Sequence, residues 1–178
     1  MASIFLSYAR SDDEVFARRL HADLTRAGFD VWFDRASMPG RQLPFPQEIR
    51  DAIAACDRVL LVVGPGVLAE GWAAKEWRFA HFELGKCVNP IVRLNGCRAD
   101  SGIIDGYELI PEDLKLLHAE DFRDDAQYDK HLANLIRQIS EPVPPVGKLV
   151  AVPELPACFL AQPDRIKALR DLLLIDLQ

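Results

Sequence analysis

Short apolar runs alternate along the chain with segments whose apolar residues recur every three or four positions. The runs predict β-strands at residues 4–8, 30–34, 59–63, 87–92 and 119–122. The periodic segments predict amphipathic helices at residues 11–27, 49–56, 72–85 and 132–139. Strand and helix therefore alternate about five times, which is typical of a parallel sheet covered by helices on both faces.

The first helix and the two longest connections have recognisable signals. Ser11 and Glu14 have the spacing of a capping box, and Gly28 stands where a glycine commonly ends a helix. Residues 35–46, with three prolines, and residues 95–111, with three glycines, follow neither the strand nor the helix pattern. We therefore expect long loops in both places.

The helix predicted at residues 72–85 follows a continuous apolar run that is typical of a central parallel strand. One stripe of this helix is expected to face the core, and it consists of Ala73, Trp77, Ala80 and Leu84. Glu76 lies on the neighbouring stripe, with Trp72 one turn before it and Phe79 one turn after it. The immediate neighbours of this carboxylate are therefore aromatic.

Glu76 is placed near the start of a helix that follows a central strand, where α/β folds hold their ligands. A partly desolvated carboxylate at such a position is typical of a functional site. The alternative is that Glu76 is a solvated helix residue, favoured one turn into the helix by the helix dipole. This helix alone leaves both interpretations open.

Length and charge limit the classes of partner. The chain has 178 residues, of which 49% are hydrophobic, enough for one packed domain and a smaller appendage. Its 27 acidic and 21 basic side chains give a net charge of −6, which argues against a surface that neutralises nucleic-acid phosphates. No stretch approaches the roughly 18 consecutive apolar residues of a membrane helix. We expect no nucleic-acid partner and no membrane span.

Cysteines and histidines indicate neither disulfides nor a metal site. The four cysteines form no C-x-x-C pair, and Cys56 and Cys87 stand in segments that are expected to be buried. The four histidines have no metal-ligand spacing. Together with the lack of a charged leader before the first strand, these features favour a cytoplasmic protein without a bound metal.

The chain changes character at Glu141. Five prolines fall within residues 142–156, a density that favours an extended, semi-rigid segment. We therefore expect a domain at residues 1–141, a linker at residues 142–162 and an amphipathic helix at residues 163–178. This last helix either begins a further domain or packs on the first one.

Three stretches, in this order, resemble the Toll/interleukin-1 receptor (TIR) domain family over residues 1 to about 140. They are Phe5-Leu6-Ser7-Tyr8, residues 34–40, and Gly64-Pro65-Gly66 followed by Trp72 and Glu76. The resemblance implies a flavodoxin-like three-layer α/β fold, with a five-stranded parallel sheet flanked by helices. It also implies that residues 35–46 form the BB loop, which controls self-association; its central residues are Ser37, Met38, Pro39, Gly40 and Arg41.

Many prokaryotic and plant TIR domains cleave NAD⁺ between nicotinamide and ribose, with a glutamate of the third helix. Glu76 matches that position. The resemblance therefore implies an NAD⁺ glycohydrolase that releases nicotinamide and ADP-ribose or a cyclic isomer, with NAD⁺ as substrate and no separate cofactor. It also implies activation by self-association, and a role as effector domain of a bacterial immune (antiphage) receptor.

Five residues near the ends of the first two strands and the start of the third helix are candidate substrate contacts: Tyr8, Arg10, Trp32, Asp34 and Trp72. Trp32 is an equally good candidate for the core. In NAD-cleaving members, an arginine often follows the aromatic residue of the first strand. Here Ala9 stands in that position and Arg10 comes one residue later, so the contacts to the substrate are expected to differ.

Two other functions stay open. One is a TIR domain without catalysis, which signals through homotypic contacts of the BB loop. The other is a flavodoxin-like receiver or nucleoside-processing domain, although no phosphorylatable aspartate ends the third strand. Residues 152–174 are also similar to the lead-in of NB-ARC signalling ATPases. No phosphate-loop motif occurs here, so such an ATPase would lie after residue 178.

Overall fold

The computed structural model describes residues 2–33, 47–67, 71–97 and 102–142. Its central feature is a sheet of five parallel strands in the order β2-β1-β3-β4-β7. The strands are β1 (Ser3–Ser7), β2 (Asp30–Trp32), β3 (Arg58–Val63), β4 (Cys87–Val92) and β7 (Glu120–Asp121). All five predicted strands are confirmed, with small differences at their ends.

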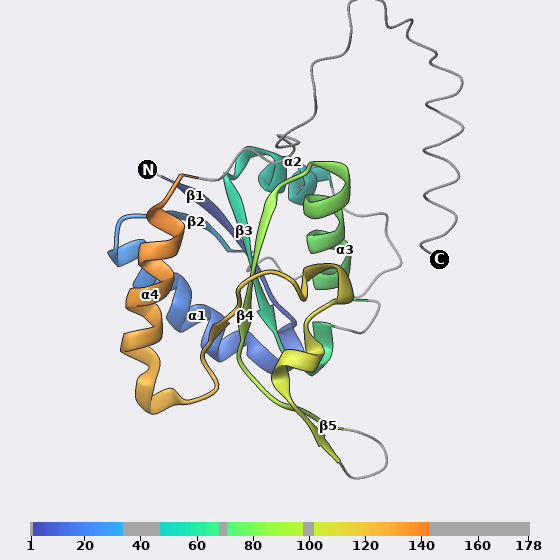
Figure 1. Cartoon of the computed structure of the whole chain (residues 1–178). Helices are drawn as coiled ribbons and strands as arrows, with labels where there is room; N and C mark the ends of the chain where they lie inside the picture. Colours follow the sequence, from blue (N-terminus) through green and yellow to red (C-terminus); the bar gives the residue numbers. More distant parts are fainter. Residues whose placement is uncertain (1, 34–46, 68–70, 98–101, 143–178) are drawn as a thin grey trace, which may run out of the picture. The chain divides into compact units, whose positions relative to one another are not determined.

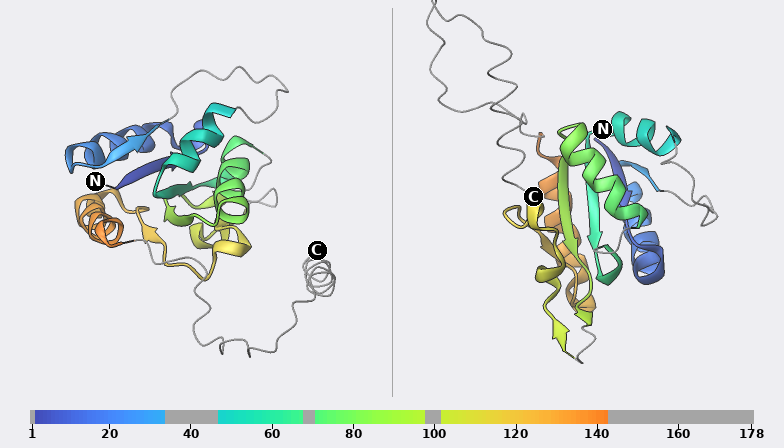
Figure 2. Two further views of the ribbon diagram at one scale, coloured as in Figure 1. Left: turned by 90° about the horizontal axis from the view of Figure 1, so that it is seen from above. Right: turned by 90° about the vertical axis from the view of Figure 1, so that its right-hand side faces the viewer.

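Helices cover both faces of this sheet (Figures 1 and 2). In the described residues, the α-helices are α1 (Arg10–Arg26), α2 (Gln47–Ala55), α3 (Trp72–Arg78) and α4 (Tyr128–Ser140). Helices α1 and α4 lie on one face, and α2 and α3 on the other. The predicted flavodoxin-like, three-layer α/β fold is confirmed.

The sheet separates two apolar layers, because alternate side chains of a strand point to opposite faces. On β3, Val59, Leu61 and Val63 belong to the layer that includes residues of α2 and α3, whereas Leu60 and Val62 belong to the layer that includes α1 and α4. Every residue of β3 is buried. This explains its continuous apolar sequence, since a strand covered on both faces has no position that faces water.

The start of α1 differs from the prediction. The helix begins at Arg10, and its N-cap is Ala9, which makes no side-chain cap hydrogen bond. The Asp13 amide donates to the Ala9 carbonyl at 3.0 Å, so Ser11 already lies inside the first turn and the predicted capping box does not form. At the other end, Gly28 has a φ of 97°, which confirms the glycine terminus because such a backbone conformation favours glycine.

The helix that begins at Trp72 changes its winding at Phe79. Residues Phe79–Glu83 (η2) form a π-helical turn, in which the Leu84 amide donates to the Phe79 carbonyl at 3.2 Å. The extra residue in this turn rotates the side chains that follow by about 100° relative to a regular α-helix. The first three residues of the predicted apolar stripe are buried, but Leu84 is exposed. Its assignment to the core was wrong for this reason.

The segment predicted as a loop at residues 95–111 is partly regular. It contains a small antiparallel sheet of β5 (Gly96–Cys97) and β6 (Ile103–Ile104). Strands of two residues are too short to show a periodic pattern, so the sequence could not indicate them. Short 3₁₀ turns complete the described elements: η1 (Pro65–Val67), η3 (Gly106–Leu109), η4 (Glu112–Leu114) and η5 (Asp125–Gln127).

Several sequence predictions lie outside the described residues. They concern the loop at residues 35–46, most of the linker at residues 142–162 and the helix at residues 163–178. None of the described helices combines the length and the apolar character that crossing a membrane requires.

The strand order has a switch point between β1 and β3. From β1 the chain passes to β2 on one side, and it then returns to β3 on the other side of β1. Open α/β sheets bind their ligands beyond the carboxyl ends of the strands at such a point. Ser7 ends β1, and Gly64 directly follows β3. Side chains around these two residues therefore occupy the position of a binding site.

Candidate functional site at the switch point

A buried hydroxyl and a buried carboxylate meet at the switch point. The Ser7 hydroxyl donates a hydrogen bond to Glu76 Oε2, with an oxygen–oxygen distance of 2.6 Å. Ser7 is fully buried, and Glu76 is 6% exposed. A buried carboxylate oxygen needs a hydrogen-bond donor in place of water, and the Ser7 hydroxyl supplies one. The interpretation of Glu76 as a solvated helix residue was therefore wrong.

The fold joins these two residues from positions 69 apart in the sequence. On β1, Phe5 and Ser7 point to the same face because the side-chain period of a strand is two, and Phe5 belongs to the apolar layer of α2 and α3. Glu76 lies on α3, which packs against β1. Ser7 thus occupies a core position that an apolar side chain would otherwise fill.

Asp13 is a second buried carboxylate in this region, which the sequence patterns do not assign to the site. It is 1% exposed and lies against Gly64, where an added Cβ would overlap Asp13 Oδ2. The capping-box interpretation concerned Ser11 and Glu14 and assigned no role to Asp13 between them. The available signal is Gly64 itself, since a glycine directly after a central strand indicates a close approach of another group.

Aromatic stacking holds two of the predicted substrate contacts, Tyr8 and Trp32. Tyr8 stacks on Phe33 with ring centroids 5.2 Å apart, and Trp32 stacks on Phe5 with centroids 4.6 Å apart. Tyr8 and Phe33 pack against the layer of α1, whereas Trp32 packs against the layer of α2 and α3. Trp32 is therefore on the same side of the sheet as Glu76, and the structure does not bring Tyr8 and Trp32 together. Both side chains are half-buried.

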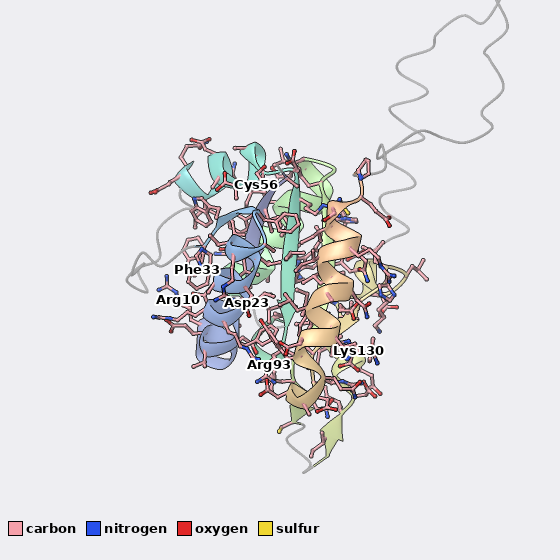
Figure 3. The ribbon with its side chains drawn as sticks, turned by 90° about the vertical axis from the view of Figure 1, so that its left-hand side faces the viewer. Arg10, Asp23, Phe33, Cys56, Arg93 and Lys130 are labelled. Carbon is pink, nitrogen blue, oxygen red and sulfur yellow. The ribbon has the colours of Figure 1, made fainter. Side chains whose placement is uncertain are left out.

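Two other predicted contacts lie at the starts of helices. Trp72 is the first residue of α3 and is half-buried, with the Lys75 ammonium 5.1 Å from its ring centroid. Arg10 is the first residue of α1 and is exposed; its side chain is labelled in Figure 3, which looks onto α1 and α4. Arg10 comes three residues after the end of β1, and Trp72 comes at the end of the connection that follows β3. Both residues thus lie after the carboxyl end of a strand, as predicted.

The remaining predicted residues lie outside the described part of the chain. They are Asp34, Ser37, Met38, Pro39, Gly40 and Arg41. Within the described residues, no group of three or more His, Cys, Asp or Glu side chains is placed to hold a metal ion.

A hollow of about 330 Å³ lies beside the edge strand β2. Its lining includes Trp32, Phe33, His21 of α1 and Cys56 after α2, but not Glu76. Burial raises the pKa of the Cys56 thiol to about 11, which makes this cysteine a poor nucleophile at neutral pH. We assign no chemistry to this hollow.

A third buried carboxylate lies at the opposite edge of the sheet. Glu120 of β7 is paired with His131 Nδ1 at 2.8 Å, and it accepts hydrogen bonds from Gln138 Nε2 at 2.8 Å and Asn134 Nδ2 at 3.4 Å. Burial alone would raise the pKa of Glu120, but these hydrogen bonds outweigh it and hold the pKa below its ordinary value. His118, which precedes β7, also lies 3.6 Å from Glu120 Oε2. Because the three hydrogen-bond partners belong to α4, Glu120 attaches this helix to the edge strand.

The comparison with protein families now identifies the domain. The model of the TIR domain family matches residues 4–136, which include the Ser7–Glu76 pair and all five strands of the sheet except Ser3, the first residue of β1. This chain belongs to the TIR domain family. A comparison with curated proteins gave no match.

Solved TIR structures share the fold of this TIR domain. The TIR domain of the Toll-related receptor TRR-2 from Hydra magnipapillata is 23% identical, with a TM-score of 0.59 over 79% of this chain and 100% of that chain. A TIR-STING receptor from C. gigas in complex with 2′,3′-cGAMP is 26% identical, with a TM-score of 0.55 over 81% of this chain. The TIR domains of the activated Roq1 resistosome, which directly recognises the pathogen effector XopQ, are 15% identical, with a TM-score of 0.54 over 78% of this chain and 99% of that chain.

These structures place the TIR domain in proteins of different size. The chain spans 41% of the length of the TIR-STING receptor but almost all of the Roq1 TIR chain. At these sequence identities, the comparisons establish the fold of this chain. Any activity has to be inferred from the residues of its own site.

Proposed function

We propose that this TIR domain is an NAD⁺ glycohydrolase, which cleaves the bond between nicotinamide and ribose and releases nicotinamide with ADP-ribose or a cyclic isomer. The observation that supports this proposal is the buried Glu76 carboxylate, bound to Ser7 at the switch point of the sheet. A glutamate in the corresponding helix performs this reaction in the TIR domains that the sequence resembles. NAD⁺ is the substrate, and no cofactor is needed.

One carboxylate suffices for this reaction. Most glycosidases use two carboxyl groups, one of which protonates the leaving group. The nicotinamide of NAD⁺ is a pyridinium cation while it is bonded to the ribose, so it departs as a neutral molecule without a proton. Positive charge develops on the ribose as the bond breaks, and an anion beside it stabilises that transition state.

The burial of Glu76 strengthens this electrostatic effect. Opposite charges attract each other more strongly in a protein interior than in water, because the dielectric constant is lower. A carboxylate that is already oriented also needs no reorganisation during the reaction. Such an interaction is worth several kcal/mol, which corresponds to a rate factor of about 10² to 10⁴.

The residues around Glu76 have proposed roles in binding. Arg10 is exposed at the end of β1, and a guanidinium there suits the diphosphate of NAD⁺. Trp72 begins the helix that carries Glu76, and its ring suits contact with a base. Tyr8, Trp32 and Asp34 remain proposed substrate contacts. Tyr8 and Trp32 pack on opposite layers of the sheet, so they would contact different parts of NAD⁺.

Self-association belongs to the same proposal. Clustering of TIR domains through the BB loop, at Ser37, Met38, Pro39, Gly40 and Arg41, switches the activity on. The domain then acts as the effector of a bacterial antiphage receptor in the cytoplasm, in which an NB-ARC-like ATPase after residue 178 brings copies together.

The test follows nicotinamide release from NAD⁺ by the purified chain, clustered through a multivalent tag and verified as clustered by light scattering. Glu76→Gln keeps the shape of the side chain but removes its charge, so we expect turnover to fall by about 10² to 10⁴. Glu120→Gln is the matched control, because it makes the same change at an equally buried position. It should keep turnover within about threefold of the parent.

Two outcomes would contradict the proposal in different ways. Nicotinamide release that is unchanged in Glu76→Gln would remove this residue from catalysis. A clustered parent that releases no nicotinamide would reject the glycohydrolase and favour a TIR domain that signals through homotypic contacts alone.

A further inference from the structure

The hydrogen bond between Ser7 and Glu76 points to a specific task for the serine. We infer that Ser7 is the positioning residue of this site, whose hydroxyl holds the Glu76 carboxylate in the orientation in which it stabilises the developing ribose cation. This inference rests on the proposed function. It assigns to Ser7 no bond to the substrate and no proton transfer.

The first argument is the position of Ser7 in an apolar layer. Phe5 precedes it on the same face of β1, and Leu61 is its register partner on β3. A buried hydroxyl is unfavourable unless it is hydrogen-bonded. An alanine would fill this position without a polar group, so packing alone does not call for a serine. The structure gives this hydroxyl a carboxylate as its partner.

The second argument concerns the two elements that the bond connects. Glu76 lies on α3, a short helix that passes into a π turn three residues later, and its carboxylate is separated from the backbone by three rotatable bonds. Ser7 lies on β1, which is paired on both sides, with β2 and with β3. A central strand is a rigid support, and small displacements of a catalytic group reduce rates strongly. The hydrogen bond therefore transfers the rigidity of the sheet to the carboxylate.

The chain offers a matched control on the same strand. Ser3, at the other end of β1, also donates a hydrogen bond to a carboxylate, from its hydroxyl to Asp57 Oδ2 at 3.0 Å. This pair is exposed and lies at the amino end of the sheet. Ser3→Ala thus removes the same atom from the same strand, away from Glu76.

The experiment measures kcat and KM for nicotinamide release by the clustered full chain. We expect Ser7→Ala to lower kcat by about 10- to 100-fold while KM changes by less than about threefold, because an interaction with a catalytic group is lost rather than one with the substrate. Ser7→Cys should lie between the parent and Ser7→Ala, since a thiol is a weak donor of similar size. Ser3→Ala should stay within about twofold of the parent.

A double-mutant cycle separates positioning from a general effect on the fold. In the Glu76→Gln background, Ser7→Ala should lower the residual turnover by less than about threefold. The same four proteins are unfolded with urea, and the shifts in midpoint of the two single variants should not add up in the double variant. This second measurement reports the contact without requiring activity.

The failures of the two claims can be told apart. An active parent whose kcat falls no more in Ser7→Ala than in Ser3→Ala would overturn the inference and leave the proposed function standing. An equal loss of turnover in the parent and Glu76→Gln backgrounds, or additive midpoints in urea, would also overturn it. A clustered parent without any nicotinamide release would overturn the proposed function and the inference together.

Discussion

Glu76 and Glu120 are equally buried, each 6% exposed, but they are bound in different ways. Glu120 lies on the edge strand β7 and is paired with an imidazole and two amides, all from α4. Glu76 lies on α3 and is bound to a hydroxyl at the end of the central strand β1. Burial of a carboxylate is common to both sites. What distinguishes them is the type of partner and the position in the sheet.

The partners of Glu120 explain its role. His131, Asn134 and Gln138 are spaced three and four residues apart, so they lie on one face of α4 and converge on one acceptor. Such an arrangement stabilises the attachment of a helix to a strand. Glu76, in contrast, lies at the switch point between β1 and β3, where sheets of this kind hold ligands. We therefore interpret Glu120 as structural and Glu76 as functional.

The largest expected effect on stability separates these two roles. Glu120→Leu should lower the free energy of unfolding by about 2 to 4 kcal/mol, because it leaves three half-buried polar side chains of α4 without their acceptor. Glu76→Leu should lower it by only about 1 kcal/mol, because the loss of the acceptor of the buried Ser7 hydroxyl is partly offset by the burial of an apolar side chain in an apolar layer. Both values are measured by urea unfolding of the same purified chain.

The control for this pair is Glu48→Leu, an exposed glutamate in the first turn of α2. It should change the free energy of unfolding by less than about 0.5 kcal/mol. An equal loss of stability in Glu76→Leu and Glu120→Leu would end the distinction between the two glutamates.

The fold could be predicted from the sequence to a large extent because its pattern is strong. The continuous apolar run of β3 and the periodic helices between strands follow directly from burial on two faces or on one. The π turn at η2 could not be predicted from the sequence. It changes the hydrogen-bond pattern of the helix, but the spacing of the apolar residues along the sequence does not show that change. Leu84 was therefore assigned to the wrong side.

The candidate site could be predicted only in part. Glu76 was found through its aromatic neighbours on one helix, which is a local pattern. Its contact with Ser7 joins residues 69 apart in sequence, so no local pattern contains it. The signal that remained unused was a polar residue in the core-facing row of an apolar strand, because a buried hydroxyl requires a partner. Asp13 was missed for a related reason, since it resembled part of a helix cap.

Two glycines allow a sharper comparison of the same two regions. A Cβ at Gly64 would overlap the Asp13 carboxylate near the switch point, whereas a Cβ at Gly106 would lie 2.6 Å from the Leu94 carbonyl oxygen on the β4–β7 side. Asp13 is 1% exposed, but its carboxylate ends a side chain and can shift further than a backbone carbonyl can. We expect Gly106→Ala to lower the free energy of unfolding by about 2 kcal/mol and Gly64→Ala by about 1 kcal/mol.

Activity should follow the opposite order for these glycine variants. Gly64→Ala displaces a carboxylate at the proposed catalytic end, so nicotinamide release should fall by about tenfold. Gly106→Ala should leave it within about threefold at temperatures where the protein is folded. Equal turnover in both variants would show that the region around Asp13 and Gly64 does not belong to the site.

The smallest expected effect concerns pH and Glu120. Burial acts to raise the pKa of this carboxyl, but its hydrogen bonds hold the pKa below the ordinary value. The unfolded chain therefore binds a proton at a higher pH than the folded protein does, and stability increases with pH across that interval. The contribution is complete above the ordinary carboxyl range, at about pH 5, and is lost as the pH falls through the native pKa. Urea unfolding of the parent and of Glu120→Gln, from about pH 7 to about pH 3, should show a difference in stability that narrows at the acidic end. The groups that face Glu120 include His118 and His131. A difference that stayed constant between about pH 5 and about pH 3 would contradict the assignment of the effect to this carboxylate.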